Sequence, residues 1–276
     1  MPSPPHISWF VDSGMELETA DGSTVKIIEF QHREDARVLH EWAKHFREHY
    51  CLDKEIDELR EGTGLTRGQY LLTRIFPSKT SRLGPGIRSG DFAEILVADY
   101  LEFLQKWTVP RTRYRLKSSP DESTKGTDIL GFKLAPRTNL AKGVYSPNDV
   151  LLCVEVKAQF SGRSARPKLQ DAINDSAKDQ YRTSLSLNAM RQRLLLVQDR
   201  DAAQVVRRFQ NATDRPYLSQ SAAAAFFCDS IFDAQIVSTA STEGHPEPDT
   251  LFLLVFKGKD MMKLVHRLYE MAADAA

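Results

Sequence analysis

The sequence has few cysteines and no long apolar run. Its three cysteines, Cys51, Cys153 and Cys228, are odd in number and far apart in the 276 residues, which fits neither a disulfide framework nor a zinc knuckle. No apolar run approaches the roughly 20 residues that span a bilayer. The opening segment, MPSPPHISWF, lacks the basic stretch and apolar core of a secretory signal. Together these absences predict a protein of the reducing cytoplasm with no membrane segment.

The sequence also lacks an excess of charge of either sign. Lysine plus arginine and aspartate plus glutamate each number 37, so the net charge is zero. Because nucleic-acid-binding domains are often basic overall, the net charge gives no support to DNA binding, and only local clusters can do so. With 41% hydrophobic and 27% charged residues, the composition is that of a globular protein.

The order of apolar patterns predicts a mixed α/β (α+β) fold. Expected strands cover residues 14–30 (a hairpin with its turn at Asp21-Gly22), 111–117, 127–134, 149–159, 224–237 and 250–258. Expected helices cover residues 34–50, 53–62, 91–107, 167–192, 200–211 and 259–272. Residues 66–76 fit a helix or a strand, and residues 77–90 are expected to be a loop. We therefore expect an N-terminal elaboration over residues 1–80, a hairpin plus helices, and a core domain over residues 81–276.

The stretch DVLLCVEVKAQF, residues 149–160, places two charged residues in an apolar strand. Side chains alternate between faces along a strand, so Glu155 and Lys157 share one face while the residues between them are apolar. Such a strand is expected in the middle of the sheet, where a charge is costly unless it is paired or bound to a metal. One interpretation is an ion pair at the solvated end of the strand, and the other is a functional site.

Two further acids favour the functional site. Asp128 begins the expected strand before Glu155, and Glu94 lies on an apolar helix with no cation at helical spacing. Carboxylates are the ligands that Mg²⁺ prefers, and a metal-dependent phosphodiester hydrolysis needs such ligands. We expect Asp128 and Glu155 to bind Mg²⁺, with Mn²⁺ as a substitute. Lys157 would orient the attacking water or stabilise the developing charge, and Glu94 would support the metal site.

This order of residues resembles the PD-(D/E)xK nuclease superfamily. The resemblance rests on Glu94, then Asp128 in GTDILGF, then Glu155-Val-Lys157 in CVEVKAQF, and it covers about residues 88–195. Thr127 stands where the proline of the family's name would be. The resemblance implies a restriction-endonuclease-like core, a mixed central sheet flanked by helices, with metal-dependent nuclease activity.

Four longer segments are similar to the HamA family, the nuclease subunits of Hachiman anti-phage defence systems. They are SGDFAEILVADYLEF, KGTDILGFKL, LLCVEVKAQF and LFLLVFKGKDMMKLVHRLYE. This resemblance implies DNA as the substrate and a partner, a superfamily 2 DNA helicase (HamB), that restrains the nuclease. Residues 1–80, outside the expected core, are a candidate partner-binding region. The alternative is a catalytically silent DNA-binding or interaction subunit of a helicase complex.

Several basic residues are candidates for contacting DNA. On the expected strand 111–117, one face carries Arg111, Arg113, Arg115 and Lys117, with Thr112, Tyr114 and Leu116 on the other. Four like charges on one face suit either a phosphate backbone or a solvated edge strand. A second cluster follows Glu155 and consists of Arg163, Arg166 and Lys168. On the next helix, Lys178 and Gln180 are further active-site candidates, although an ordinary exposed helix face is the favoured interpretation.

Two histidines have the spacing of part of a zinc site. His45 and His49 lie one helical turn apart and can share a metal, but the sequence shows no third ligand. Exposed helix histidines are therefore the favoured interpretation.

Overall fold

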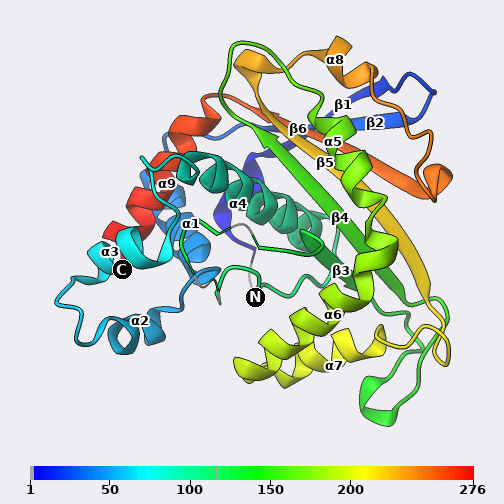
Figure 1. Cartoon of the computed structure of the whole chain (residues 1–276), viewed down its shortest axis with the longest axis horizontal. Coiled ribbons are helices and arrows are strands. Elements are labelled where there is room, and N and C mark those ends of the chain that lie inside the picture. The colour runs from blue at the N-terminus through cyan, green and yellow to red at the C-terminus, as the bar shows by residue number, and fades with distance from the viewer. Residues whose placement is uncertain (1–2, 116, 118, 123) are drawn as a thin grey trace.

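Six strands form a single mixed sheet in the computed structural model, which describes residues 3–115, 117, 119–122 and 124–276 (Figure 1). The strands are β1 (Phe10–Glu18), β2 (Thr24–Phe30), β3 (Ile129–Lys133), β4 (Val150–Gln159), β5 (Leu218–Cys228) and β6 (Leu251–Gly258). Their order across the sheet is β1-β2-β6-β5-β4-β3. β2, β6, β5 and β4 run parallel, and β1 and β3 pair antiparallel at the two edges. This sheet with its flanking helices confirms the predicted mixed α/β fold and is compatible with a PD-(D/E)xK-like core.

Helices cover both faces of the sheet. They are α1 (Ala36–Glu48), α2 (Asp53–Arg60), α3 (Arg67–Tyr70), α4 (Gly84–Asp99), α5 (Lys168–Ser176), α6 (Asp179–Leu196), α7 (Arg200–Arg208), α8 (Ala234–Ser238) and α9 (Met261–Asp274). Helices α1, α4 and α9 share the largest apolar core with one face of the sheet. On the other face, α5 packs over one half and α6 and α7 over the other, each with its own apolar cluster. Figure 1 shows α6 and α7 gathered beside β3 and β4.

The alternation of side chains along β4 and β5 explains these layers. On β4, Val154 and Val156 face the α4 side, whereas Leu151 and Cys153 face α6 and α7. Glu155 is two residues from Cys153 and therefore lies on the α6 side. β4 is flanked by β3 and β5, so it is an interior strand, as its apolar sequence predicted.

Most of the predicted elements are confirmed. The hairpin forms with β1 and β2 antiparallel, and α1 begins where Asp35 caps the amides of Arg37 and Val38. The segment left open, residues 66–76, is helical, with α3 continuing into a π-helical turn (Leu71–Ile75). Around residue 177 the expected long helix is broken into α5 and α6.

Three predictions about the elements are wrong. The expected loop 77–90 contains the first turns of α4, because Pro85 occupies the first turn of a helix, where its missing amide hydrogen costs nothing. The expected strand 224–237 ends at Cys228, and Asp233 caps the short helix α8. Residues 111–115 and 117 lie outside any strand, and Leu116 lies outside the described residues.

The first 80 residues share the sheet and the core with the rest of the chain. β2 pairs in parallel with β6, and α1 packs beside α9 in the main apolar core. The division at residue 80 remains a prediction, but β1 and β2 cannot be removed without exposing β6. In the part of the chain that the structure describes, no helix is long and apolar enough to cross a membrane. The three cysteines are buried and unpaired.

Candidate functional site

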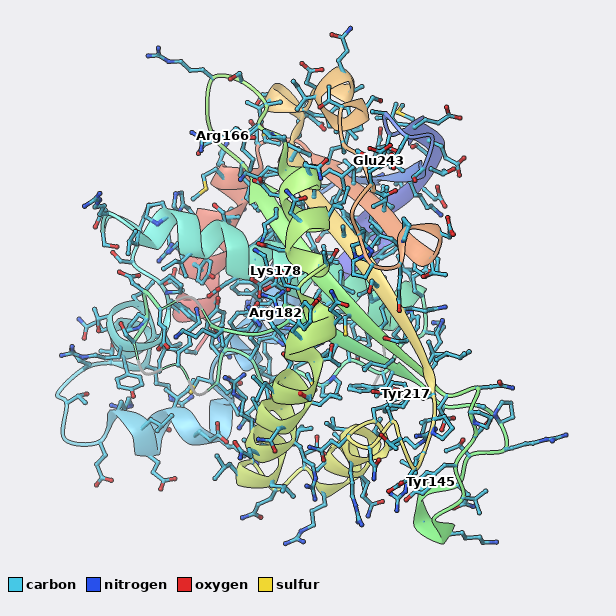
Figure 2. The ribbon with its side chains drawn as sticks, turned by 45° about the vertical axis from the view of Figure 1, so that its right-hand side comes forward. Tyr145, Arg166, Lys178, Arg182, Tyr217 and Glu243 are labelled. Carbon is cyan, nitrogen blue, oxygen red and sulfur yellow. The ribbon has the colours of Figure 1, made fainter. Side chains whose placement is uncertain are left out.

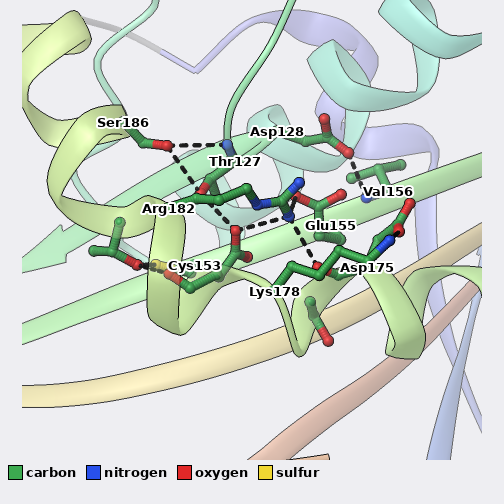
Figure 3. Close-up of polar contacts among 12 residues, drawn as sticks. Thr127, Asp128, Cys153, Glu155, Val156, Asp175, Lys178, Arg182 and Ser186 are labelled. Atoms are coloured by element: carbon green, nitrogen blue, oxygen red, sulfur yellow. Dashed lines mark hydrogen bonds and ion pairs between the residues drawn. The ribbon is translucent and has the colours of Figure 1, made fainter.

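Asp128 and Glu155 lie side by side at the junction of β3 and β4. Ile129 pairs with Val154 in the antiparallel ladder, so Asp128, one residue earlier, lies beside Glu155, one residue later. The carboxylate of Asp128 is fixed because its Oδ2 accepts a hydrogen bond from the Val156 amide at 2.9 Å (Figure 3). Glu155 is almost fully buried, with 2% of the residue exposed. The strand pairing thus brings the two predicted metal ligands together.

Arg113 joins Asp128 to Glu94. Its Nη2 donates to Asp128 Oδ1 at 2.7 Å, and its Nε forms an ion pair with Glu94 Oε2 at 2.9 Å that lacks hydrogen-bond alignment. Two main-chain carbonyls, those of Thr127 and Thr124, accept from its other donors at 2.7 and 2.8 Å. A guanidinium with four anchors is rigidly held. Arg113 therefore occupies the position between the two carboxylates where a cation is required.

Arg182 of α6 performs a similar role for Glu155. Its Nη2 lies 2.9 Å from Glu155 Oε1 and 3.0 Å from Asp179 Oδ1. Figure 3 shows this side chain extending from α6 toward β4. Asp179 also accepts a hydrogen bond from the hydroxyl of Thr127 at 2.7 Å, which connects the helix to the residue that precedes Asp128. The contacts of α6 thus set the position of Glu155 relative to Asp128.

Lys157 lies at the open end of the site. Its Nζ is 3.6 Å from Glu155 Oε2 and 2.6 Å from Asp175 Oδ2. Asp175, near the C-terminal end of α5, also pairs with Lys178 at 2.5 Å. The side chain of Lys157 is 26% exposed, and its ammonium lies between the buried carboxylate of Glu155 and the partly exposed carboxylate of Asp175.

The charges of the site are unbalanced. Burial, together with the carboxylates of Asp128 and Asp179, raises the pKa of Glu155 to about 8. Burial and the carboxylates of Asp128 and Asp91 raise the pKa of Glu94 to about 8, although Arg113 opposes this. The pKa of Lys157 is raised because the contact with Asp175 and nearby carboxylates outweighs its desolvation. Glu94 and Glu155 thus favour taking up a proton or a further cation.

The chemistry of these donors fits Mg²⁺. Glu94, Asp128 and Glu155 offer only oxygen atoms, which a hard divalent cation prefers. Their oxygens do not form a closed triad, however. Among the described residues, one group of three histidine, cysteine or acidic residues has its ligand atoms within 4.8 Å of one another. That group lies elsewhere in the fold. Binding of one ion by all three acids would require Arg113 to give up its bonds to Glu94 and Asp128.

The basic stripe predicted at residues 111–117 does not exist as a free strand face. Each of its four cations contacts a carboxylate from another segment: Arg111 with Asp99 and Glu102, Arg113 with Glu94 and Asp128, Arg115 with Glu55, and Lys117 with Asp91. The alternating basic residues that predicted a strand form ion pairs within the protein instead. The side chain of Lys117 is only 4% exposed, so this residue is not part of an open DNA-binding surface.

The second basic cluster is more accessible. Arg163 and Arg166 are exposed on the loop after β4, while Lys168 pairs with Asp171 at 2.6 Å. Figure 2 shows Arg166 on this loop, at the opposite end of α5 from Lys178 and Arg182. Gln180 is exposed on α6.

The segment α5–α6 contributes more to the site than its sequence predicted. Arg182, not Lys178 or Gln180, contacts Glu155, and Asp175 is the partner of Lys157. The spacing of Asp175, Asp179 and Arg182 places all three on one side of the α5–α6 segment. This spacing could have indicated that the three side chains lie together over the site, but it crosses the break between α5 and α6.

Comparison with known proteins places these residues within a family. The family model described as HamA matches residues 5–272. The match includes every residue of the site described above, from Glu94 to Arg182. No curated protein matches the chain.

Proposed function

The chain belongs to the HamA family of Hachiman anti-phage defence, and from this premise we propose that it is a metal-dependent deoxyribonuclease. The observation that carries the proposal is the pairing of Asp128 with Glu155 at the β3–β4 junction, with Lys157 beside them. A buried carboxylate beside one that is 10% exposed, with a partly exposed ammonium next to them, suits phosphodiester hydrolysis better than it suits stability.

The roles of the residues follow from their positions. Asp128 and Glu155 would hold Mg²⁺, and Glu94 would join them or hold a water of the ion. Bound Mg²⁺ would neutralise the scissile phosphate and make a water more acidic. Lys157 would position the phosphate or the attacking water and would stabilise negative charge as it develops. Arg182 would keep Glu155 oriented, because it bonds both Glu155 and Asp179.

Two variants test the assignment. We expect Glu155→Gln and Lys157→Ala to abolish Mg²⁺-dependent DNA cleavage by the full chain, with its partner present. Matched controls are Glu243→Gln and Lys142→Ala, which alter exposed side chains outside the site. Calorimetric Mg²⁺ titration separates the roles: Glu155→Gln should lose binding and Lys157→Ala should retain it. Full cleavage by either site variant would refute the assignment.

A catalytically silent subunit is the second candidate, and one observation favours it. Arg113 and Arg182 already form ion pairs with three of the acids, so these side chains are held in place without a metal. A silent subunit would show no Mg²⁺-dependent change in stability or fluorescence. Saturable Mg²⁺ binding that Asp128→Asn abolishes would exclude this candidate.

We also propose a superfamily 2 helicase as the protein partner and residues 1–80 as a contact region. Within these residues, α2 and α3 lie at the periphery of the fold (Figure 1). Leu59 on α2 is 50% exposed, a suitable contact for a partner. Copurification with a helicase encoded beside this chain should weaken in Leu59→Asp. The control is Leu185→Asp on α6, whose leucine is 71% exposed. Equal copurification of both variants would contradict this contact region.

A further inference from the structure

Three histidines and an aspartate converge where the N-terminal turn, α1 and the end of α4 meet. His6, on a 3₁₀ turn (Pro5–Trp9), His45 of α1 and Asp99 of α4 each place a ligand atom within 4.8 Å of the others. His49 lies next to this group, with its Nε2 3.3 Å from His45 Nε2. His6 and Asp99 are fully buried, and His49 is 5% exposed. The interpretation of His45 and His49 as exposed helix histidines is therefore wrong for His49.

The hydrogen bonds of the cluster compete for the same atoms. His45 Nε2 lies 3.0 Å from Asp99 Oδ1 and also faces His49 Nε2. If His45 Nε2 carries a proton, it must share that proton between the carboxylate and the second ring. If it carries none, it faces the carboxylate with a lone pair. A cation between these atoms removes the conflict, because all of them bind it through lone pairs.

Several contacts among these residues are close in length to the separation of ligand atoms around a metal ion. Ligand atoms about 2.0–2.1 Å from a tetrahedral Zn²⁺ ion lie about 3.3–3.4 Å from one another. Three contacts here are of similar length: His45 Nε2 lies 3.3 Å from His49 Nε2 and 3.0 Å from Asp99 Oδ1, and His6 Nε2 lies 2.9 Å from Asp99 Oδ2. We propose that His6, His45, His49 and Asp99 form a structural zinc site. Three imidazoles and one carboxylate are ligands typical of Zn²⁺.

The neighbouring groups support a structural role. Arg111 shares Asp99 Oδ1 with His45 at 2.9 Å, so Oδ2, which faces His6, is the oxygen left for the ion. Trp42 stacks on the ring of His6, with ring centroids 4.6 Å apart, and fixes its plane. The side chain of His45 is 23% exposed, which provides the route by which an ion enters. A filled site would fasten the N-terminal turn and α1 to the end of α4.

The zinc site lies close to the acids of the nuclease site. A cavity of about 60 Å³ is lined by His49 and also by Glu94 and Asp128. Asp99 and Glu94 both belong to α4, five residues apart. The two sites must therefore be tested separately, because an ion added to the protein can reach either.

Metal content and Co²⁺ substitution test the proposal. The full chain, expressed with Zn²⁺ and dialysed against Mg²⁺, should hold about one zinc per chain. Replacement by Co²⁺ should give the visible d–d absorption of a tetrahedral complex. His45→Gln and His49→Gln should each weaken Zn²⁺ binding more than about tenfold, since loss of even an outer-shell partner costs that much. His40→Gln, an exposed histidine of α1, is the matched control and should bind as the wild type does.

The result does not depend on nuclease activity. Asp128→Asn should leave the zinc content unchanged, which assigns the ion to the histidine site. Chelation should lower the Tm of the wild type and of His40→Gln but not that of His45→Gln. A wild-type chain with no bound zinc and no Co²⁺ spectrum would overturn the proposal. Wild-type zinc content in both His45→Gln and His49→Gln would do the same.

Discussion

Replacing Arg113 with methionine should destabilise the metal-free protein strongly. The change removes the cation between Glu94 and Asp128 but keeps much of the side chain's length. It also leaves the carbonyls of Thr127 and Thr124 without their donors. The paired side chains are 10–15% exposed, so they are only weakly screened by water.

The size of the effect follows from leaving buried acids without a partner. Removal of one member of a buried ion pair costs about 3–5 kcal/mol. Glu94 can relieve part of this by taking up a proton, because burial raises its pKa to about 8. We therefore expect the free energy of unfolding at neutral pH to fall by about 3 kcal/mol, the low end of that range.

Added Mg²⁺ should reverse most of this loss. An ion at about 100 times its dissociation constant stabilises the folded state by about 2.7 kcal/mol. In the wild type the ion must first displace Arg113 from Glu94 and Asp128, so the same Mg²⁺ should stabilise it less. Urea unfolding with and without Mg²⁺ measures both quantities. Arg163→Met, at an exposed arginine, is the matched control.

Two outcomes would refute this reasoning. An unchanged free energy of unfolding in Arg113→Met would show that its ion pairs contribute nothing to the fold. Equal stabilisation of variant and wild type by Mg²⁺ would show that the guanidinium and the metal do not compete. Either result would leave the nuclease assignment to be judged on the Glu155 and Lys157 variants alone.

Three further predictions concern stability. The pKa of Glu155 is about 8 in the folded state and 4.5 ordinarily, so its contribution to stability is present below pH 4.5 and is lost as the pH rises through 8. Glu155→Gln cannot ionise, and its Tm should therefore rise relative to that of the wild type over this pH range. A constant difference in Tm would contradict this. Asp149→Asn leaves a fully buried arginine of α7 without its carboxylate and should cost about 3–5 kcal/mol in urea unfolding. Because hydrogen bonds lower the folded pKa of Asp149 despite its burial, the difference from the wild type should shrink as the pH falls below 3.8, and a difference that grows in acid would refute it. Gly84→Ala places a methyl group against the carbonyl of Ser78 and should cost about 1–3 kcal/mol, whereas Gly86→Ala, with no atom within 4 Å, should cost nothing of that kind.

The sequence by itself determined the elements whose patterns are local. The alternation on residues 149–159 predicted β4 and the shared face of Glu155 and Lys157, because side-chain direction in a strand follows from its period of two. The Asp21-Gly22 turn predicted the β1–β2 hairpin, because Asp-Gly favours the tight turn that joins two antiparallel strands. Both predictions needed only neighbouring residues.

The tertiary structure alone decided which charges meet. Arg113 pairs with Glu94, 19 positions earlier in the sequence. The alternating arginines around Arg113 predicted a strand, because the neighbouring residues do not show that each arginine pairs with a distant acid. His6 and Asp99, which contact each other, are 93 residues apart in the sequence. An ion pair or a shared ligand site depends on which segments fold against each other, and that dependence leaves no periodic pattern in the chain. For this reason the proximity of His6 and Asp99 to the two histidines of α1 could not be seen in the sequence; it arises only when α1, α4 and the N-terminal turn pack together.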